Sequence, residues 1–241
     1  MTEQWFDRVP APLRRPVVFD QRWRNVTFLH WPVEPAAVAP LFPAGCRPDL
    51  VDGLSYVGLV PFELRRATIG AGPAVPYFGS FAETNIRLYS VDDAGRHGVV
   101  FRSLDTERLA ILPIARLLFG VPYAWSRMRV ERQAGVVAYD SQRRLPRRGL
   151  SSAVTVRISE PIQASPLERW LTARWGLHAR IGGRTRWVPN SHGPWPLHEA
   201  SVLELRDDLL AASGVVPCGP RLRALWSPGV RTRFGLPITL D

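Results

Sequence analysis

Residues 82–105 read AETNIRLYSVDDAGRHGVVFRSLD and indicate the fold class of the chain. From residue 82 to residue 91 polar and apolar side chains alternate, which is the period of a β-strand with two unlike faces. Residues 92–95 (Asp-Asp-Ala-Gly) have the composition of a tight turn, and residues 98–105 continue as a second β-rich segment. The stretch therefore predicts a hairpin of two antiparallel strands.

The same patterns outside the hairpin predict eight to ten strands in all, with two or three short helices. Further strands are expected at 25–31, 54–67, 125–133, 136–142, 153–159 and 184–188. Helices are expected at 35–41, at 107–119, and from the capping box Ser165-Pro166-Leu167-Glu168 through Arg174. Residues 197–210 fit a strand, a helix, or both in turn. We expect an α+β fold whose mostly antiparallel strands form a barrel or a strongly curved sheet.

One domain is expected over residues 1–241, with an irregular proline-containing arm at 1–16. The chain has 241 residues, is 46% hydrophobic and 22% charged, and contains no repeat or linker. Its 23 prolines and nine tryptophans suit strands joined by rigid turns. The first residues lack a basic segment followed by an apolar one, and no apolar run reaches the length of a membrane span. A cytoplasmic protein without a membrane partner is expected.

All 31 basic side chains are arginine, so the chain contains no lysine. This composition is typical of GC-rich bacterial genomes. Guanidinium stays protonated and is a poor nucleophile, so imine chemistry on a lysine is excluded. The formal charge of +10 raises the possibility of nucleic-acid binding. The arginines are dispersed, however, with one cluster at 143–148 in an expected loop, and no recognition motif accompanies them. Nucleic-acid binding is therefore the weaker interpretation.

Neither a metal site nor a nucleotide cofactor is expected. The five histidines are not spaced as paired ligands on one helix or strand, and the two cysteines form no metal motif. Residues 69–73 (Ile-Gly-Ala-Gly-Pro) lack the glycine spacing of a dinucleotide site, and no nucleophile elbow is present. We expect no cofactor.

Three groups of residues carry a family resemblance. The first is Phe28-Leu29-His30-Trp31 followed by residues 52–62 (DGLSYVGLVPF), and the second is 83–89 (ETNIRLY) followed by 98–105 (GVVFRSLD). The third is 115–124 (ARLLFGVPYA) with His192-Gly193-Pro194-Trp195 later. In this order they resemble the YqjF-like family of bacterial proteins, over about residues 17–235. That family is similar in fold to acetoacetate decarboxylase, which implies a barrel around a small-molecule cavity.

The resemblance also has a departure. Where the decarboxylases carry a Gly-x-Pro-Lys-Lys stretch with the imine-forming lysine, this chain reads Gly120-Val121-Pro122-Tyr123-Ala124. A phenol and a methyl group replace the two lysines. The resemblance thus implies a decarboxylase-like cavity without decarboxylase chemistry.

The candidate site residues begin with one face of the strand at 82–91, where Glu83, Asn85, Arg87 and Tyr89 share a side. This polar face either lies in solvent or lines a ligand cavity, and both readings stay open. In a cavity, Glu83 would be the acid or base and Arg87 its cationic neighbour, with Asn85 beside them as a ligand contact. The resemblance places the corresponding glutamate of the decarboxylases in their pocket.

Further candidates come from the helix at 107–119, the loop after it and the histidines. Arg116 is either a surface residue or, as the resemblance implies, a carboxylate ligand. Tyr123 could donate to a substrate oxygen or simply pack. For His30 we favour a buried core histidine over a ligand contact. His192 and Trp195 lie in one loop, and they either pack there or lie at the mouth of a ligand cavity.

Two function classes follow. The first is a small-molecule-binding barrel acting as a lysine-independent acid–base enzyme, such as an isomerase, hydratase, cyclase or non-imine lyase. Its partner would be a small anionic or carbonyl-containing compound. The second is a non-catalytic ligand-binding or sensor protein with the same cavity. Convergence of Glu83 with Arg87 or Tyr123 around one free volume would favour the enzyme.

Overall fold

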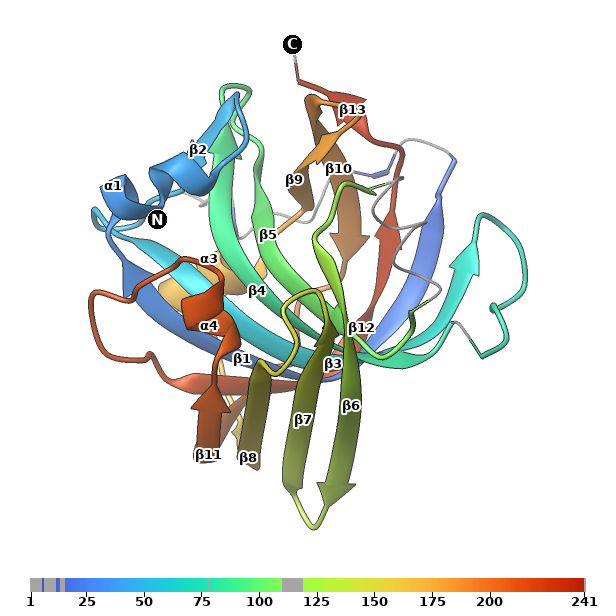
Figure 1. Ribbon diagram of the computed structural model, residues 1–241, viewed down its shortest axis with the longest axis vertical. Helices are drawn as coiled ribbons and strands as arrows, with labels where there is room; N and C mark the ends of the chain where they lie inside the picture. Colours follow the sequence, from blue (N-terminus) through green and yellow to red (C-terminus); the bar gives the residue numbers. More distant parts are fainter. Residues whose placement is uncertain (1–5, 7–11, 14–15, 78, 110–118, 241) are drawn as a thin grey trace.

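A computed structural model describes residues 6, 12–13, 16–77, 79–109 and 119–240. Thirteen strands lie in this part of the chain (Figure 1): β1 (Phe19–Val33), β2 (Cys46–Pro48), β3 (Ser55–Ile69), β4 (Phe81–Asp92), β5 (His97–Thr106), β6 (Tyr123–Gln133), β7 (Val136–Leu145), β8 (Ser151–Pro161), β9 (Gly176–Ile181), β10 (Arg184–His192), β11 (His198–Asp207), β12 (Ala224–Phe234) and β13 (Ile238–Thr239). The described helices are short: α1 (Pro35–Val38), the 3-10 helix η2 (Ala39–Leu41), α3 (Pro166–Thr172) and α4 (Leu209–Ala212).

Nine of these strands form a closed barrel. The hydrogen-bonded order runs β4–β5–β6–β7–β8–β11–β12–β1–β3 and returns to β4. Every pair in this ring is antiparallel except β5 with β6, which run parallel. Because β1 pairs with β12 on one edge and β3 on the other, the ring joins the two ends of the chain.

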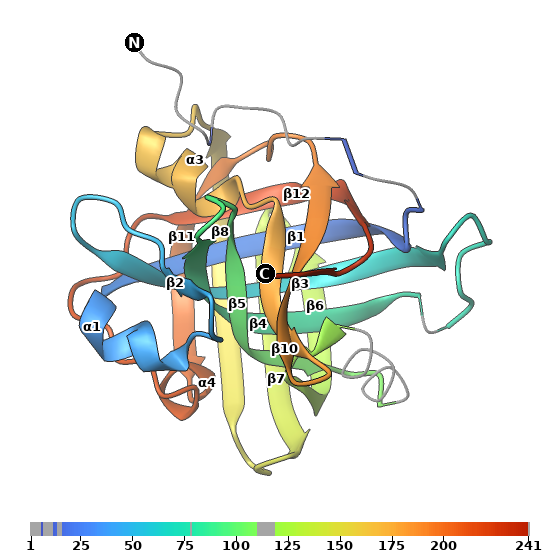
Figure 2. The ribbon, with the colours of Figure 1, turned by 90° about the horizontal axis from the view of Figure 1, so that it is seen from above.

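A second, smaller ring shares part of the first. Strands β9 and β10 bridge β5 to β12 on the side opposite β6–β11, which closes the order β12–β1–β3–β4–β5–β9–β10. Five strands, β12, β1, β3, β4 and β5, belong to both rings. In Figure 2 three of these shared strands, β12, β1 and β3, cross the sheet made by β6, β7, β8 and β11.

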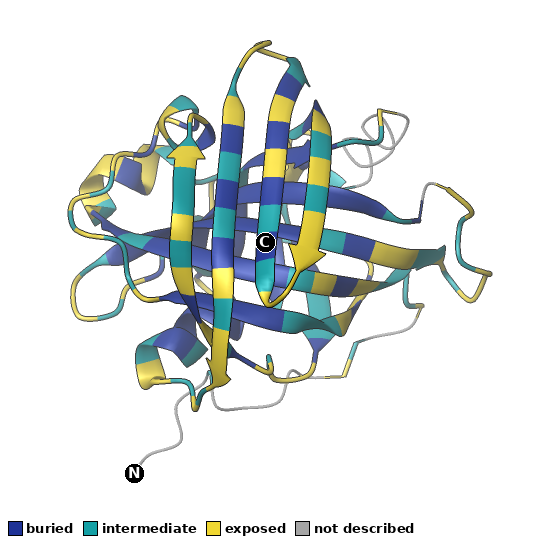
Figure 3. Ribbon diagram, turned by 90° about the horizontal axis from the view of Figure 1, so that it is seen from below, coloured by how far each residue is buried: buried dark blue, intermediate teal, exposed yellow. Residues whose placement is uncertain are grey.

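The shared strands carry two apolar faces. Strand β4 is buried at eleven of its twelve positions, whereas β7 and β8 alternate between buried and exposed residues (Figure 3). One β4 face, with Ile86 and Leu88, packs in the core of the nine-strand barrel. Tyr89 on the other face packs in a separate core inside the smaller ring. Burial on both faces explains why β4 is rich in large side chains and still includes polar ones.

The capping box at Ser165 is confirmed. The Ser165 hydroxyl accepts from Glu168 N, and Glu168 Oε2 accepts from Ser165 N at 2.8 Å. The helix ends at Thr172, two residues earlier than expected. Residues 197–210 form a strand and then a helix, β11 followed by α4. None of the described helices is long and apolar enough to cross a membrane.

Three fold predictions need correction. The label α+β is too loose, because strands dominate and the helices are only single turns or little more. The strands β2, β9, β12 and β13 were not predicted. The arginine cluster at 143–148 is not all loop, since β7 continues to Leu145 and Arg143 is buried. Residues 110–118 of the helix expected at 107–119 fall outside the described residues, and residues 107–109 before them are not helical. Most of the arm at 1–16 is outside the described residues as well.

Candidate functional site

A cavity of about 350 Å³ opens inside the smaller ring, at the end where β1 begins. Its wall is almost entirely apolar, and Gln21, Glu83 and Tyr123 are the polar side chains among its described lining residues. The rest of the wall is formed by Phe19, Trp23, Leu64, Ala67, Ile69, Val75, Gly79, Phe81, Phe101, Leu104, Phe119, Val121, Leu177 and Phe234. A concave apolar site with a few converging polar groups is the usual form of a small-molecule pocket. We call it the Glu83 cavity.

Glu83 and Tyr123 meet in this cavity. The Tyr123 hydroxyl donates to Glu83 Oε2 at 2.8 Å, and it joins the start of β6 to the start of β4. Burial, with a smaller contribution from the negative charge of Asp105, raises the pKa of Glu83 to about 8, although the bond from Tyr123 opposes the shift. Burial and the neighbouring Glu83 raise the pKa of Tyr123 well above its usual value. At neutral pH the cavity therefore holds a protonated carboxyl group beside a protonated phenol.

The backbone before Tyr123 is held close to β9. Gly120 has a φ of +59°, and a Cβ built there would lie 2.1 Å from the carbonyl oxygen of Arg180. Only glycine fits this approach. Two residues after Val121, Tyr123 pairs with Leu104 in the parallel β5–β6 ladder, which fixes the direction of its side chain. Glycine and parallel pairing thus place the phenol opposite Glu83.

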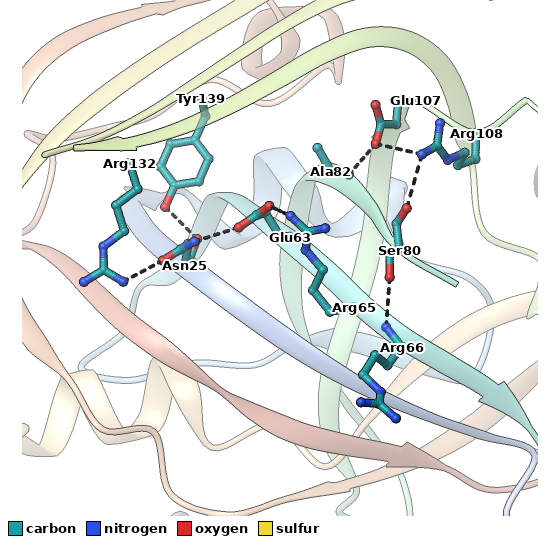
Figure 4. A network of polar contacts seen from close by, with 10 residues as sticks. All are labelled: Asn25, Glu63, Arg65, Arg66, Ser80, Ala82, Glu107, Arg108, Arg132 and Tyr139. Atoms are coloured by element: carbon teal, nitrogen blue, oxygen red, sulfur yellow. Dashed lines mark hydrogen bonds and ion pairs between the residues drawn. The ribbon is translucent and has the colours of Figure 1, made fainter. Parts of the chain in front are cut away.

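Hydrogen bonds between side chains and the main chain hold the rim of the cavity in place (Figure 4). Ser80 accepts from the amide of Arg66 at 3.1 Å through its hydroxyl and from Arg108 at 3.4 Å through its carbonyl oxygen. Glu107 accepts from the amide of Ala82 at 3.2 Å. These bonds connect the segment between β3 and β4, which carries cavity residues, to the end of β5. Hydrogen bonds therefore connect this rim to β3 on one side and to the end of β5 on the other.

A second network in Figure 4 supports the bulge in β1. Asn25 has a φ of 47°. Its side-chain amide donates to Glu63 at 2.6 Å, and its main-chain carbonyl oxygen accepts from the Tyr139 hydroxyl at 2.6 Å. The bulge changes which residues of β1 face the smaller ring. Before it, Phe19 and Trp23 line the Glu83 cavity, and after it Phe28 and His30 continue the same interior.

Asn85 and Arg87 lie deeper on the Glu83 face and are not among the cavity-lining residues. Both are buried, and Arg87 lies four residues from Glu83 along β4, which is about 13 Å by the rise of a strand. Arg87 donates to Tyr89 Oη at 3.2 Å and to the carbonyl oxygen of Leu171 at 3.3 Å. Both side-chain polar atoms of Asn85 are buried without a hydrogen-bond partner among the described residues, and its lateral neighbours are Val60 and Leu104. The structure thus brings Glu83 together with Tyr123 and not with Arg87.

His30 is connected to Arg87 through the hydroxyl of Tyr89. Its Nε2 lies 2.6 Å from Tyr89 Oη, and burial with the charges of Arg87 and Arg174 lowers its pKa well below the usual value. His30 is therefore neutral and buried, as the core-histidine interpretation expects.

His192 and Trp195 lie beside the Glu83 cavity without lining it. The His192 ring packs between Trp175 and Trp195 at 4.8 and 5.2 Å, and burial lowers its pKa to about 4. Trp195 donates to the carbonyl oxygen of Thr172 at 3.2 Å and packs on Trp23, which does line the cavity. Their contact with the cavity is thus indirect. Arg116 lies outside the described residues.

The sequence did not predict the aromatic side chains that line the Glu83 cavity, such as Phe19, Phe81 and Phe234. Phe19 falls between the expected arm at 1–16 and the expected strand at 25–31, and Phe234 lies in a strand that was not predicted. Phe81 carried a usable signal, because it stands two residues before Glu83 and period two places both on one face.

The fold is that of the acetoacetate decarboxylase-like barrels. An acetoacetate decarboxylase-like enzyme from Sphingomonas wittichii RW1 superposes with a TM-score of 0.65 at 14% identity, over 94% of each chain. The enduracididine biosynthesis enzyme MppR in complex with pyruvate gives a TM-score of 0.65 at 14% identity, over 95% of this chain and 92% of that one. At such low identity the likeness shows the fold alone.

Within that class, the chain belongs to the DUF2071 family, described as an uncharacterized conserved protein, which matches residues 20–231. It is 32% identical over 188 residues to the uncharacterized protein YqjF of Bacillus subtilis (strain 168), across 77% of each chain. The resemblance to YqjF-like proteins is confirmed.

Proposed function

We propose that the protein binds a small, largely apolar carbonyl compound in the Glu83 cavity and acts on it as a lysine-independent acid–base enzyme. One observation carries the proposal: a carboxyl group with a pKa of about 8 faces an apolar cavity and is bonded to a phenol. Proton transfer is most efficient when the pKa of the catalytic group lies near the working pH. Glu83 meets this condition.

The two groups have different roles in the proposed chemistry. The neutral Glu83 carboxyl donates a hydrogen bond or a proton to the ligand oxygen, and its carboxylate form can remove a proton from carbon. Tyr123 keeps its proton at all ordinary pH values, so it orients Glu83 and stabilises the ionised form through its hydrogen bond. Isomerisation, hydration and non-imine lyase reactions all need this exchange of protons at a carbonyl compound.

The wall of the cavity favours a neutral ligand over an anionic one. No arginine is among the described lining residues, so a carboxylate would be buried there without a cation. A carbonyl oxygen needs only the donor that Glu83 supplies. The pyruvate bound to MppR is a carbonyl compound that also carries a carboxylate, so it supports the carbonyl group of the proposed ligand and not its neutral charge.

Imine formation has no place in the proposal, because the chain has no lysine. Borohydride added together with acetoacetate should leave no reduced adduct on any internal residue, as measured by peptide mass spectrometry. An internal adduct would contradict the proposed mechanism.

The experiment is hydrogen–deuterium exchange at carbon, followed by NMR in D₂O with acetophenone as a neutral probe and phenylpyruvate as its charged counterpart. We expect exchange of the acetophenone methyl protons above the buffer rate with the wild type, and none above it with Glu83→Gln. Glu160→Gln, an exposed position on β8, is the matched control and should behave as the wild type. Exchange that is equal in wild type and Glu83→Gln would overturn the proposal.

The alternative is a non-catalytic ligand-binding protein. The small number of polar groups in the wall favours it, since an apolar cavity can bind without reacting. Saturable acetophenone binding without any exchange at carbon would identify this function instead.

A further inference from the structure

A second cavity, of about 590 Å³, lies on the other side of the segment that carries Tyr123. Residues Val121 and Tyr123 line both cavities and separate them. The second cavity is bounded by β5, by the start of β6, by the turn after β7, by β9 and by α4. Four arginines lie in its wall: Arg102, Arg143, Arg147 and Arg180. We call it the arginine cavity.

Arg143 has an acidic partner within the protein. It is buried and forms an ion pair with Asp105, in which Nε donates to Oδ2 at 2.9 Å. Ser103 and Ser126 donate to the same carboxylate at 2.8 and 2.5 Å. Asp105 is completely buried, so this closed network belongs to the wall of the cavity. The positive charge of Arg143 is therefore balanced by Asp105 inside the protein.

The other three arginines have no carboxylate partner among the described residues. Arg102 donates to the carbonyl oxygens of Leu41 and Ser213, and Arg147 donates to that of Ala212 at 3.0 Å. No ion pair of Arg180 occurs in the described part of the chain. Burial lowers the pKa of Arg102, which shows that its guanidinium is partly removed from water. Three positive charges thus surround one hollow.

Several arginines elsewhere on the surface have an acidic partner. Arg47, Arg129, Arg206 and Arg231 each pair with an aspartate or glutamate within 2.8 Å. With 31 arginines and 21 acidic residues, some guanidinium groups must lack an acidic partner, and three such groups line this one cavity. Neutralising these charges would require a ligand that brings negative charge from outside.

We propose that the arginine cavity binds a small, multiply charged oxyanion. Guanidinium groups donate to phosphate and carboxylate oxygens in the same fork-like geometry, so the shared chemistry is that of a phosphate ester or a polycarboxylate. The volume holds a ligand larger than a single inorganic ion. This site is distinct from the Glu83 cavity, so its existence does not depend on the proposed carbonyl chemistry.

The test is isothermal titration calorimetry with inorganic pyrophosphate and with citrate, at constant ionic strength. The variant is Arg147→Gln/Arg180→Gln, which removes two exposed side chains of the wall. The matched control is Arg129→Gln/Arg206→Gln, whose side chains are 72% and 78% exposed on β6 and β11. Both variants lower the formal charge from +10 to +8. The ionic environment therefore changes equally in the two proteins.

We expect the wild type and the control to bind at least one probe, and the cavity variant to bind it about tenfold more weakly for each arginine removed. Binding of pyrophosphate alone would identify a phosphate site, and binding of citrate alone a carboxylate site. An equal loss in both variants would show attraction to net charge only, and would overturn the proposal. So would the absence of heat with either probe in the wild type. Glu83→Gln should bind the probes unchanged, which separates this test from that of the Glu83 cavity.

Discussion

Tyr89 Oη lies 2.6 Å from His30 Nε2, inside the smaller ring and in the same buried row as Glu83. The same oxygen accepts from Arg87 Nε at 3.2 Å. One phenol therefore connects β1 to the buried guanidinium of β4. The backbone of Gly58 leaves room for this contact, since a Cβ there would lie 3.2 Å from the His30 ring and 3.3 Å from Tyr89 Oη.

Replacing Tyr89 by Phe should lower the free energy of unfolding by about 1–3 kcal/mol. The ring and its packing remain, while His30 and Arg87 lose the hydroxyl that both contact. Urea denaturation at pH 7 measures the change. An unchanged midpoint would show that the hydroxyl is not important for stability.

The pH dependence of stability should report on Glu83. Its pKa of about 8 in the folded protein lies above the ordinary value of 4.5, so folding favours the protonated form. That contribution is complete below pH 4.5 and is lost as the pH rises through about 8. The difference between a pKa of 4.5 and one of about 8 corresponds to about 5 kcal/mol. Relative to Glu83→Gln, which cannot titrate, the wild type should lose most of this free energy between pH 5 and pH 9. Parallel pH profiles for the two proteins would contradict the raised pKa, and Glu160→Gln serves as the control.

Replacing Tyr123 by Phe should raise the pKa of Glu83 further. The hydroxyl of Tyr123 donates to Glu83 and opposes the effect of burial, so its removal leaves desolvation uncompensated. NMR titration of a carboxyl-labelled glutamate measures the shift directly. A lowered pKa would mean that solvent enters the space left by the hydroxyl.

Replacing Asn85 by Leu should separate stability from ligand binding. In the part of the chain that the structure describes, both polar atoms of Asn85 are buried without a hydrogen-bond partner. An apolar side chain of similar size should therefore raise the free energy of unfolding by about 1–3 kcal/mol. If a ligand reaches from the Glu83 cavity to Asn85, the same variant should bind it more weakly. Thermal denaturation and acetophenone titration measure the two effects, and a destabilised variant would contradict the expectation.

Limited proteolysis tests the prediction of a single domain. Trypsin should cut in the arm before Pro16 or after the exposed Arg147 and Arg148 before it divides the barrel. Two stable fragments of similar mass would contradict one domain.

Local patterns predicted many of the strands and a barrel or strongly curved sheet, but not which distant strands pair to close it. Alternation located β4 and β5, and the capping box located α3, because these signals lie within a few neighbouring residues. The bridge from β5 to β9 depends on a pairing of Val99 with Leu177, which no local pattern contains. Strand β9 has only six residues, and β12 was not assigned from the sequence at all.

The candidate site was predictable in part for the same reason. Period two placed Glu83, Asn85 and Arg87 on one face, but it left open whether that face meets water or the interior. The answer depends on β9 and β10, which cover the face from a distant part of the sequence. Tyr123 was reached through the family resemblance and not through its local pattern. Arg87 is separated from the cavity by its distance along β4, since four residues of strand place it about 13 Å from Glu83.

The pairing of Phe19 with Phe234 affects how the protein can be made. On the ribosome, β1 emerges more than 200 residues before its partner, which at about 5–20 residues per second is roughly 10–40 s. During that interval one edge of the first strand has no neighbour, and the nascent chain cannot close either ring. The last strands to be translated therefore complete the barrel, and folding speed should be limited by this long-range contact and not by the local hairpins.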